Sequence, residues 1–196
     1  MLIIASDNLA IYKEEEKIWR SYMHSCPEHV EAYFIRGNPK LKRSSIVVDD
    51  IIWSQTKENV LPGILNKTIL SLQHFLPRLQ DKFDFVVRTN LSSFYVLPRL
   101  IAFARTLPRK NCYRGPVHSS KTLCGGLDWA AGYGMIISSD LAYKMAKTDF
   151  LINYNIGVQD DLVIALFLRN HYGITPVSHS HINIHDIFLR VDELTL

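Results

Sequence analysis

The segment FDFVVRTNLSS, residues 83–93, contains the clearest strand pattern of the sequence. Its first half, Phe83–Arg88, is a strongly apolar run of the kind that forms a strand buried on both faces of a sheet. The run stops abruptly at small polar residues, Thr89 to Ser93. Ligands of open α/β sheets bind beyond the carboxyl ends of the strands, so this boundary predicts a strand that ends in a crevice. An ordinary strand-to-helix turn, with Ser92 or Ser93 as helix N-cap, remains the alternative.

Outward from this segment, strand-like and helix-like patterns alternate along the chain, which predicts a layered α/β fold in a single domain, residues 1–196. Residues 111–129, rich in Gly, Ser and Lys, are expected to form a loop. The remaining strands are expected at Leu2–Ser6, Val30–Ile35, Ser45–Ile52 and Gly134–Ser138, and the helices at Tyr12–His24, Pro62–Leu76, Leu97–Leu107, Leu141–Lys147 and Leu162–Arg169.

Composition narrows the functional classes. The chain of 196 residues is 47% hydrophobic and 21% charged, which argues against disorder, collagen and coiled coil. A net charge of +3 permits an anionic ligand but does not indicate nucleic acid. Three cysteines are too few for a disulfide framework, no apolar run reaches the roughly 18 residues of a membrane span, and no signal peptide is evident. These features predict a cytoplasmic protein with reduced thiols and no membrane span.

Two groups of residues carry candidate chemistry late in the chain. The pair Asp160-Asp161 precedes a strongly apolar helix, where acids stabilise the helix N-terminus or, at the edge of a cleft, serve as a general base. The imidazoles of His179 and His181 alternate, so on a strand they share one face and could bind a divalent metal. Helix capping and scattered surface histidines are the respective alternatives.

A third candidate is the small-residue segment around Gly132 and Gly134, whose backbone could approach a ligand closely. A tight bend into the next strand would also explain it. Asp128 and Trp129 precede this segment, and the flat ring of Trp129 could stack on a sugar or simply lie in the core.

Taken in order, five segments resemble one family. These are ENVLPGILNKTILSL (58–72), FDFVVRTNLSSF (83–94), WAAGYGMIISSDLAYKM (129–145), VQDDLVIALFL (158–168) and PVSHSHINIHD (176–186). They resemble the β-1,3-galactosyltransferase/Fringe class of GT-A glycosyltransferases, and most closely the small glycosyltransferases that large algal DNA viruses encode for capsid glycans. The resemblance spans residues 46–186, and residues 1–45 fit only as the first βαβ unit of a nucleotide-sugar fold.

The resemblance implies a mixed, mostly parallel central sheet with helices on both sides. Residues 1–95 would form the donor-binding half and residues 96–196 the acceptor and catalytic half, either complete or as part of a longer chain. The donor would be a UDP-sugar carrying a hexose or deoxyhexose. The acceptor would be a glycan or glycoprotein, with a viral coat protein as the family-level expectation in a host cytoplasm.

The resemblance also assigns roles to residues. Asp161 would be the catalytic base, with Asp160 orienting or capping. Asp128 and Trp129 would lie on the acceptor side. Donor contacts would come from Ala5, Ser6, Asp7, Lys67, Arg88, Asn90, Gly132 and Gly134.

The expected cofactor is Mn²⁺ or Mg²⁺, held in the family by an Asp-x-Asp motif. Here the matching positions read Asn90-Leu91-Ser92, and neutral oxygens are weaker ligands than carboxylates. Either the metal is held mainly by the diphosphate, His181 and water, with Ser92 and His179 as further candidate ligands, or it is absent and Lys67 or Arg88 compensates the leaving-group charge. Because Asn90 and Ser92 stand where the motif has its two acids, a non-catalytic nucleotide-sugar or glycan-binding module is the alternative function. A hydrolase built on the histidines is a weaker third possibility.

Overall fold

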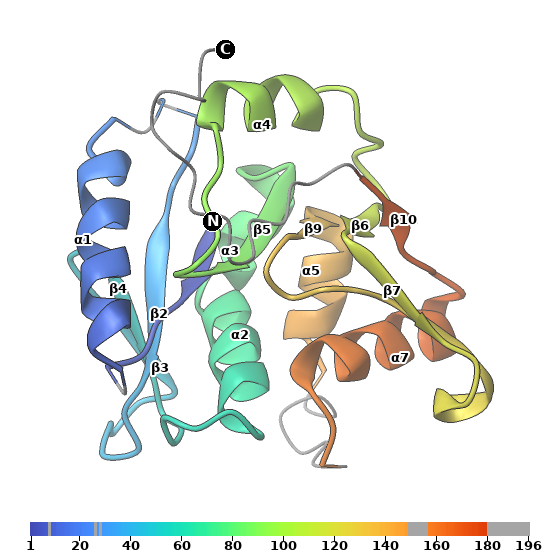
Figure 1. The fold of residues 1–196 in the computed structure, drawn as a ribbon, viewed down its shortest axis with the longest axis horizontal. Helices are drawn as coiled ribbons and strands as arrows, with labels where there is room; N and C mark the ends of the chain where they lie inside the picture. Colours follow the sequence, from blue (N-terminus) through green and yellow to red (C-terminus); the bar gives the residue numbers. More distant parts are fainter. Residues whose placement is uncertain (8, 26, 28, 149–156, 180–196) are drawn as a thin grey trace.

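The structure is a computed structural model that describes the chain except residues 8, 26, 28, 149–156 and 180–196. Within the described residues, eight strands form one sheet in the order β10-β6-β9-β5-β1-β2-β4-β3 (Figure 1). Four neighbouring strands in its centre run parallel, namely β1 (Leu2–Ile4), β2 (Tyr33–Gly37), β4 (Ile51–Ser54) and β5 (Phe85–Asn90). The remaining strands are β3 (Ser45–Val48), β6 (Tyr113–Gly115), β9 (Met135–Ser138) and β10 (Val177–Ser178).

Helices cover both faces of the sheet, which confirms the predicted α/β class with a mostly parallel sheet. The main core packs four of them against one face: α2 (Gly63–His74), α3 (Leu76–Asp81), α5 (Ser139–Ala146) and α7 (Asp160–Tyr172). The other face is covered by α1 (Ala10–Met23), through Trp19, and by α4 (Leu97–Ala104), through Leu100 and Phe103. In Figure 1, α1 lies at one end of the sheet and α7 at the other.

Successive side chains of β5 point to opposite faces of the sheet and contact different helices. Val86 contributes to the core beneath α2 and α5, whereas Val87 points to the opposite face, beneath α4. Because both faces are buried, the strand needs apolar residues at successive positions, and this explains why FDFVV was recognisable from the sequence. The ends of β1, β2 and β5 at Ile4, Gly37 and Asn90 define what we call the carboxyl edge, and their starts define the amino edge.

Two sequence-based predictions about strands are wrong. The segment Ser45–Ile52, expected as one strand, forms the hairpin of β3 and β4, with Val48 paired to Ile51. The turn between them places Asp49 at a φ of 53°, a left-handed conformation that Asp tolerates better than most residues.

Residues 111–129, expected as a loop, contain β6, β7 (Val117–Ser120), a 3₁₀ turn (Leu123–Gly125) and β8 (Leu127–Ala130). β7 and β8 form a two-stranded hairpin, and β8 packs against α7. Figure 1 shows β7 of this hairpin beside α7. The helix expected over Pro62–Leu76 ends at His74, and α3 continues the chain after it. None of the helices in the described part of the chain has the length and apolar character that crossing a bilayer requires.

Candidate functional site

A pocket of about 330 Å³ opens at the carboxyl edge, where β1 and β5 end. This is where open α/β sheets bind ligands. Five residues that the sequence analysis assigned to the donor or the metal line it, namely Ala5, Ser6, Lys67, Asn90 and Ser92. These residues come from three separate segments of the chain, and the sheet and α2 bring them together.

Lys67 forms the charged wall of this pocket. It lies on the second turn of α2, with only 1% of its surface exposed, and its Nζ donates to the Ala5 carbonyl at 3.1 Å and pairs with Glu58. Burial lowers the pKa of Lys67, although the Glu58 carboxylate opposes this shift. A buried ammonium with one carboxylate partner is a group that a second anion could engage in a low-dielectric setting.

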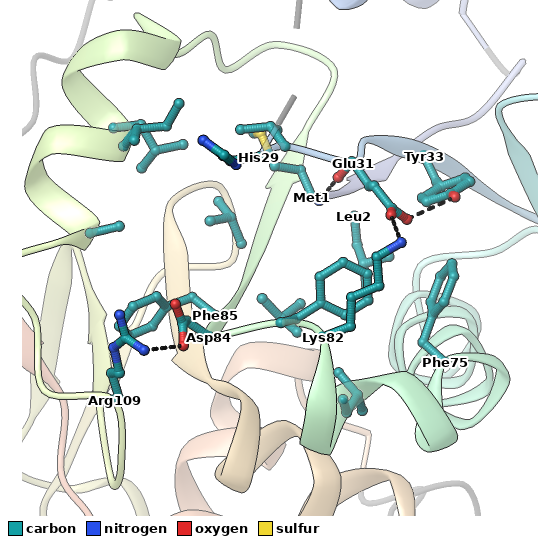
Figure 2. A pocket seen from close by; sticks show the side chains of 18 of the residues that line it. Met1, Leu2, His29, Glu31, Tyr33, Phe75, Lys82, Asp84, Phe85 and Arg109 are labelled. Carbon is teal, nitrogen blue, oxygen red and sulfur yellow. Dashed lines mark hydrogen bonds and ion pairs between the residues drawn. The ribbon is translucent and has the colours of Figure 1, made fainter. Parts of the chain in front are cut away.

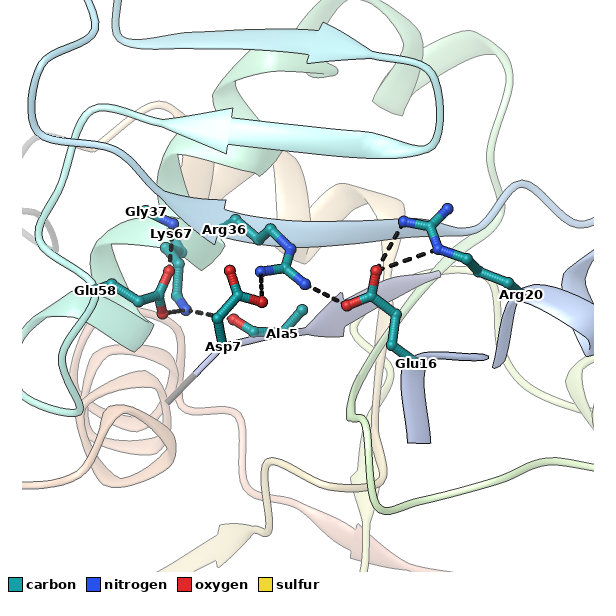
Figure 3. Close-up of polar contacts among 8 residues, drawn as sticks. All are labelled: Ala5, Asp7, Glu16, Arg20, Arg36, Gly37, Glu58 and Lys67. Carbon is teal, nitrogen blue, oxygen red and sulfur yellow. Dashed lines mark hydrogen bonds and ion pairs between the residues drawn. The ribbon is translucent and has the colours of Figure 1, made fainter. Parts of the chain in front are cut away.

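Around Lys67, a chain of ion pairs follows the carboxyl edge (Figure 3). Glu58 also accepts a hydrogen bond from the Gly37 N–H at 2.6 Å, which ties the segment before α2 to the end of β2. On the other side of Ala5, Arg36 bridges Asp7 and Glu16, and its side chain is almost fully buried. Asp7, predicted as a donor contact, is therefore held beside the pocket by Arg36 and does not line it.

The turn after β5 is fixed from the opposite face of the sheet. Trp19, fully buried in α1, donates its Nε1–H to the Leu91 carbonyl at 2.8 Å, and its ring stacks on Phe94 at 5.2 Å. This anchor holds the backbone between Asn90 and Ser92, so these two polar residues are presented to the pocket by a rigid support.

Behind the pocket, Arg88 and Asp160 form a buried ion pair. Their exposed fractions are 3% and 8%, and Nη2 lies 2.7 Å from Oδ2. Arg88 is two residues before Asn90 on β5, so both side chains point to the same face, one pleat apart. The charge of Arg88 also acts on Lys67 and lowers its pKa, so the ion pair and the pocket belong to one electrostatic unit.

Asp161 is the titratable acid of this unit. Its Oδ2 accepts from the Gly132 N–H at 3.3 Å and its Oδ1 from the Leu162 N–H at 2.9 Å. Burial raises the pKa of Asp161 above its ordinary value of 3.8, and the neighbouring Asp160 charge adds to this effect, while Arg88 and the two N–H donors oppose it. A carboxylate with a raised pKa is better matched to accepting a proton near neutral pH.

A Cβ at position 132 would lie 1.4 Å from the Arg88 guanidinium, so any side chain there would force Arg88 out of its position. The absence of a side chain lets the Arg88 guanidinium pack against the backbone that donates to Asp161. Gly134 faces Pro116 and the Tyr95 hydroxyl, where a Cβ would lie 2.9 Å from the proline ring. Neither glycine lines the pocket at the carboxyl edge.

The predicted acceptor residues lie on the β7–β8 hairpin. Asp128 is exposed and accepts a hydrogen bond from Ser119 Oγ at 2.5 Å. Trp129 is half-buried and packs on the main core, with the exposed ring of His118 stacked against it at 5.8 Å. His118 also lies 3.4 Å from the Tyr133 hydroxyl, so three aromatic side chains cluster one residue away from Gly132.

Of the predicted metal ligands, the two described residues, Ser92 and His179, are not brought together. His179 follows β10, three strands away from β5, where its N–H donates to the Gly115 carbonyl and its ring contacts Phe103. Ser92, by contrast, lines the pocket at the carboxyl edge. His181 lies outside the described residues, and among the described ones no three His, Cys, Asp or Glu side chains form a metal-binding group.

Several residues were not recognised from the sequence, chiefly Glu58 and Arg36 at the carboxyl edge and His118 on the β7–β8 hairpin. Glu58 opens the quoted segment ENVLPG and reaches Lys67 only because α2 starts at the carboxyl edge. Arg36 carries a detectable cue, since a charged residue within a buried strand requires partners. No protein-family model matches the chain, and no curated protein matches it either.

Proposed function

We propose that this chain is a GT-A-type glycosyltransferase that moves a hexose or deoxyhexose from a UDP-sugar to a hydroxyl of a glycan acceptor. The observation that carries this proposal is the pocket at the carboxyl edge, which joins Lys67, Asn90 and the end of β1. Arg88, one pleat from Asn90 on β5, pairs with the buried Asp160, and the half-buried Asp161 follows Asp160 in the chain; neither acid lines the pocket itself. A volume of about 330 Å³ lies in the size class of small-molecule sites and would admit the nucleotide part of a donor.

Binding of the donor diphosphate would fall to Lys67. In the structure its ammonium is neutralised by Glu58, a carboxylate that is about one quarter exposed. A diphosphate entering the pocket would replace Glu58 as the partner of the buried ammonium, because its oxygens also accept charge-assisted hydrogen bonds and it carries more negative charge than a single carboxylate. Arg88 is less suited to this role, since Asp160 already holds it and Gly132 packs against it.

Asp161 would act as the general base. Its carboxylate would accept the proton of the acceptor hydroxyl as that oxygen forms a bond to the anomeric carbon. The bond from the anomeric carbon to the diphosphate would break in the same step, and UDP would leave with the electron pair. A single displacement of this kind inverts the anomeric configuration.

The described residues do not fit the carboxylate-held Mn²⁺ or Mg²⁺ that the family resemblance implies. Glu58, the carboxylate that lines the pocket, is held by Lys67; Asn90 and Ser92 offer neutral oxygens, and His179 lies three strands away.

The test is release of UDP. The full chain is incubated with a panel of UDP-sugars, each with and without Mn²⁺, and free UDP is quantified. The proposal expects slow release from at least one donor, loss of release in Asp161→Asn, and nearly unchanged UDP binding by that variant. Asp84→Asn, an exposed acid at the amino edge, is the matched control and should behave as wild type.

A non-catalytic nucleotide-sugar-binding module is the second candidate, favoured by the neutral Asn90 and Ser92 in the pocket. It predicts UDP binding with no release from any donor. Release that Asp161→Asn leaves unchanged would remove Asp161 from the mechanism and contradict the proposal.

A further inference from the structure

A second and larger pocket, of about 520 Å³, lies at the opposite edge of the sheet (Figure 2). It opens at the amino edge, where β1, β2 and β5 begin, and extends between α3 on one face and α4 on the other. Because the strands separate it from the carboxyl edge, it is not an extension of the proposed donor site. No role assigned above uses it.

The interior of this pocket is apolar and aromatic. The rings of Phe75, Phe83 and Phe85 line it, together with Leu79 from α3 and Leu100 from α4. Phe75 also packs on Tyr33 at 5.1 Å and edge-on against Phe83 at 6.2 Å, so a framework of rings maintains the wall. Sites that enclose small organic ligands have this size and this lining.

Charged groups surround the opening, and both carboxylates among them are already neutralised. Glu31 pairs with Lys82 and with Arg78, and Asp84 pairs with Arg109 at 3.2 Å. Figure 2 shows the Glu31–Lys82 and Asp84–Arg109 pairs on different sides of the pocket.

Arg105, exposed at the end of α4, also lines the pocket and forms no ion pair with any described residue. Arg109 is 76% exposed on its side chain, and its ion pair with the exposed Asp84 is weakened by solvent. The pocket lining contains three cationic side chains and two carboxylates, so the rim carries a surplus of positive charge. The cations are Lys82, Arg105 and Arg109, and the carboxylates are Glu31 and Asp84.

We propose that this pocket at the amino edge binds a small amphipathic acid. Its alkyl or aromatic body fills the space among Phe75, Phe83, Phe85 and Leu100, and its anionic group lies between the guanidinium groups of Arg105 and Arg109. Burial of the apolar body supplies most of the affinity, and the rim charge selects an acid over a neutral molecule of the same shape.

The experiment measures binding of decanoate and of 8-anilinonaphthalene-1-sulfonate to the full chain, with decanol as the neutral control. We expect saturable one-to-one binding of both acids, with decanol at least about tenfold weaker. Chemical shifts of the Leu79, Leu100 and Val87 methyl groups should move on addition of decanoate. UDP should not displace either probe, so the outcome does not depend on the proposed transferase activity.

Two variants locate the site. Ala104→Trp places a large ring in the pocket and should abolish binding, while its circular dichroism and UDP affinity remain those of wild type. The double variant Arg105→Ala/Arg109→Ala should weaken decanoate about tenfold and leave decanol unchanged. Arg99→Ala, an exposed arginine on the same helix that does not line the pocket, is the matched control.

Four results would overturn the proposal. Absence of saturable binding by wild type would show that the pocket takes no such acid. Equal affinity for decanoate and decanol would contradict the role of the rim charge. Binding that persists in Ala104→Trp, or that leaves the three methyl groups unmoved in wild type, would place the probe elsewhere.

Discussion

The ion pair between Arg88 and Asp160 gives the sharpest prediction about stability. Asp160→Ala removes a carboxylate 2.7 Å from a guanidinium that is 3% exposed. At an effective dielectric constant near 20, the lost attraction is about 6 kcal/mol, and measured costs of removing one partner of a buried pair are about 3–5 kcal/mol. We expect a loss of about 3–5 kcal/mol in the free energy of unfolding, a large part of the roughly 5–15 kcal/mol of a typical domain.

Urea unfolding followed by circular dichroism would measure this loss. Asp160→Asn retains an acceptor oxygen for Arg88 and should cost less than Asp160→Ala, which separates the charge from the hydrogen bond. The double variant Arg88→Met/Asp160→Ala should be more stable than the sum of the single losses predicts, because no buried charge then lacks a partner.

The reasoning would be refuted by a loss below about 1 kcal/mol in Asp160→Ala, the range of exposed ion pairs. Strict additivity in the double variant would also refute it, because it would show that the two side chains do not interact in the folded protein.

Three further predictions concern the carboxyl edge. Gly132→Ala should displace the Arg88 guanidinium and cost about 2–4 kcal/mol in thermal or urea unfolding, whereas a cost near zero would show that Arg88 moves freely. Lys67→Met should weaken UDP binding about tenfold by calorimetry, whereas Glu58→Gln should not weaken it. Equal UDP affinities of wild type and Lys67→Met would show that the Lys67 ammonium does not bind the diphosphate. The raised pKa of Asp161 places the acidic limb of kcat/KM above pH 3.8, with activity lost as pH falls through that pKa. A value of kcat/KM that does not change as pH falls to 3.8 would contradict this prediction.

The raised pKa of Asp161 also makes the stability of the fold depend on pH: stability falls as pH rises, whereas activity rises with pH. The folded state holds a proton on Asp161 more strongly than the unfolded state does, because burial raises the pKa. The stabilisation from this group is therefore present at low pH and is lost as pH rises from about 3.8 through the raised pKa. An acid that destabilises the fold in its charged form at neutral pH is typical of a functional site.

The sequence predicted those parts of the fold whose residues are buried on a regular period. β5 and α7 were recognisable because a long run of apolar residues indicates an element that is buried in the core. The β3–β4 hairpin was missed because IVVDDIIW contains no Gly at its turn, so the two short strands look like one. β7 and β8 were missed because each strand has only four residues and β7 (VHSS) is mostly polar, so the segment shows no extended apolar alternation.

For the candidate site, sequence reasoning found side chains at strand ends but not their partners. Asn90 and Ser92 could be assigned to a crevice because a buried strand stops there. The pairing of Arg88 with Asp160 spans 72 residues, and that of Glu58 with Lys67 depends on where α2 starts. Long-range pairs of this kind follow from the topology of the sheet, which no local pattern contains.

The central claim is that the carboxyl edge binds the nucleotide of an activated sugar. A crystal structure of the full chain with UDP tests it most directly. The account predicts the nucleotide between the end of β1 and Asn90, with a phosphate oxygen within hydrogen-bond distance of Lys67 Nζ and Glu58 turned away from it. UDP found at the amino edge, or a carboxyl edge that stays empty at saturating UDP, would contradict the account.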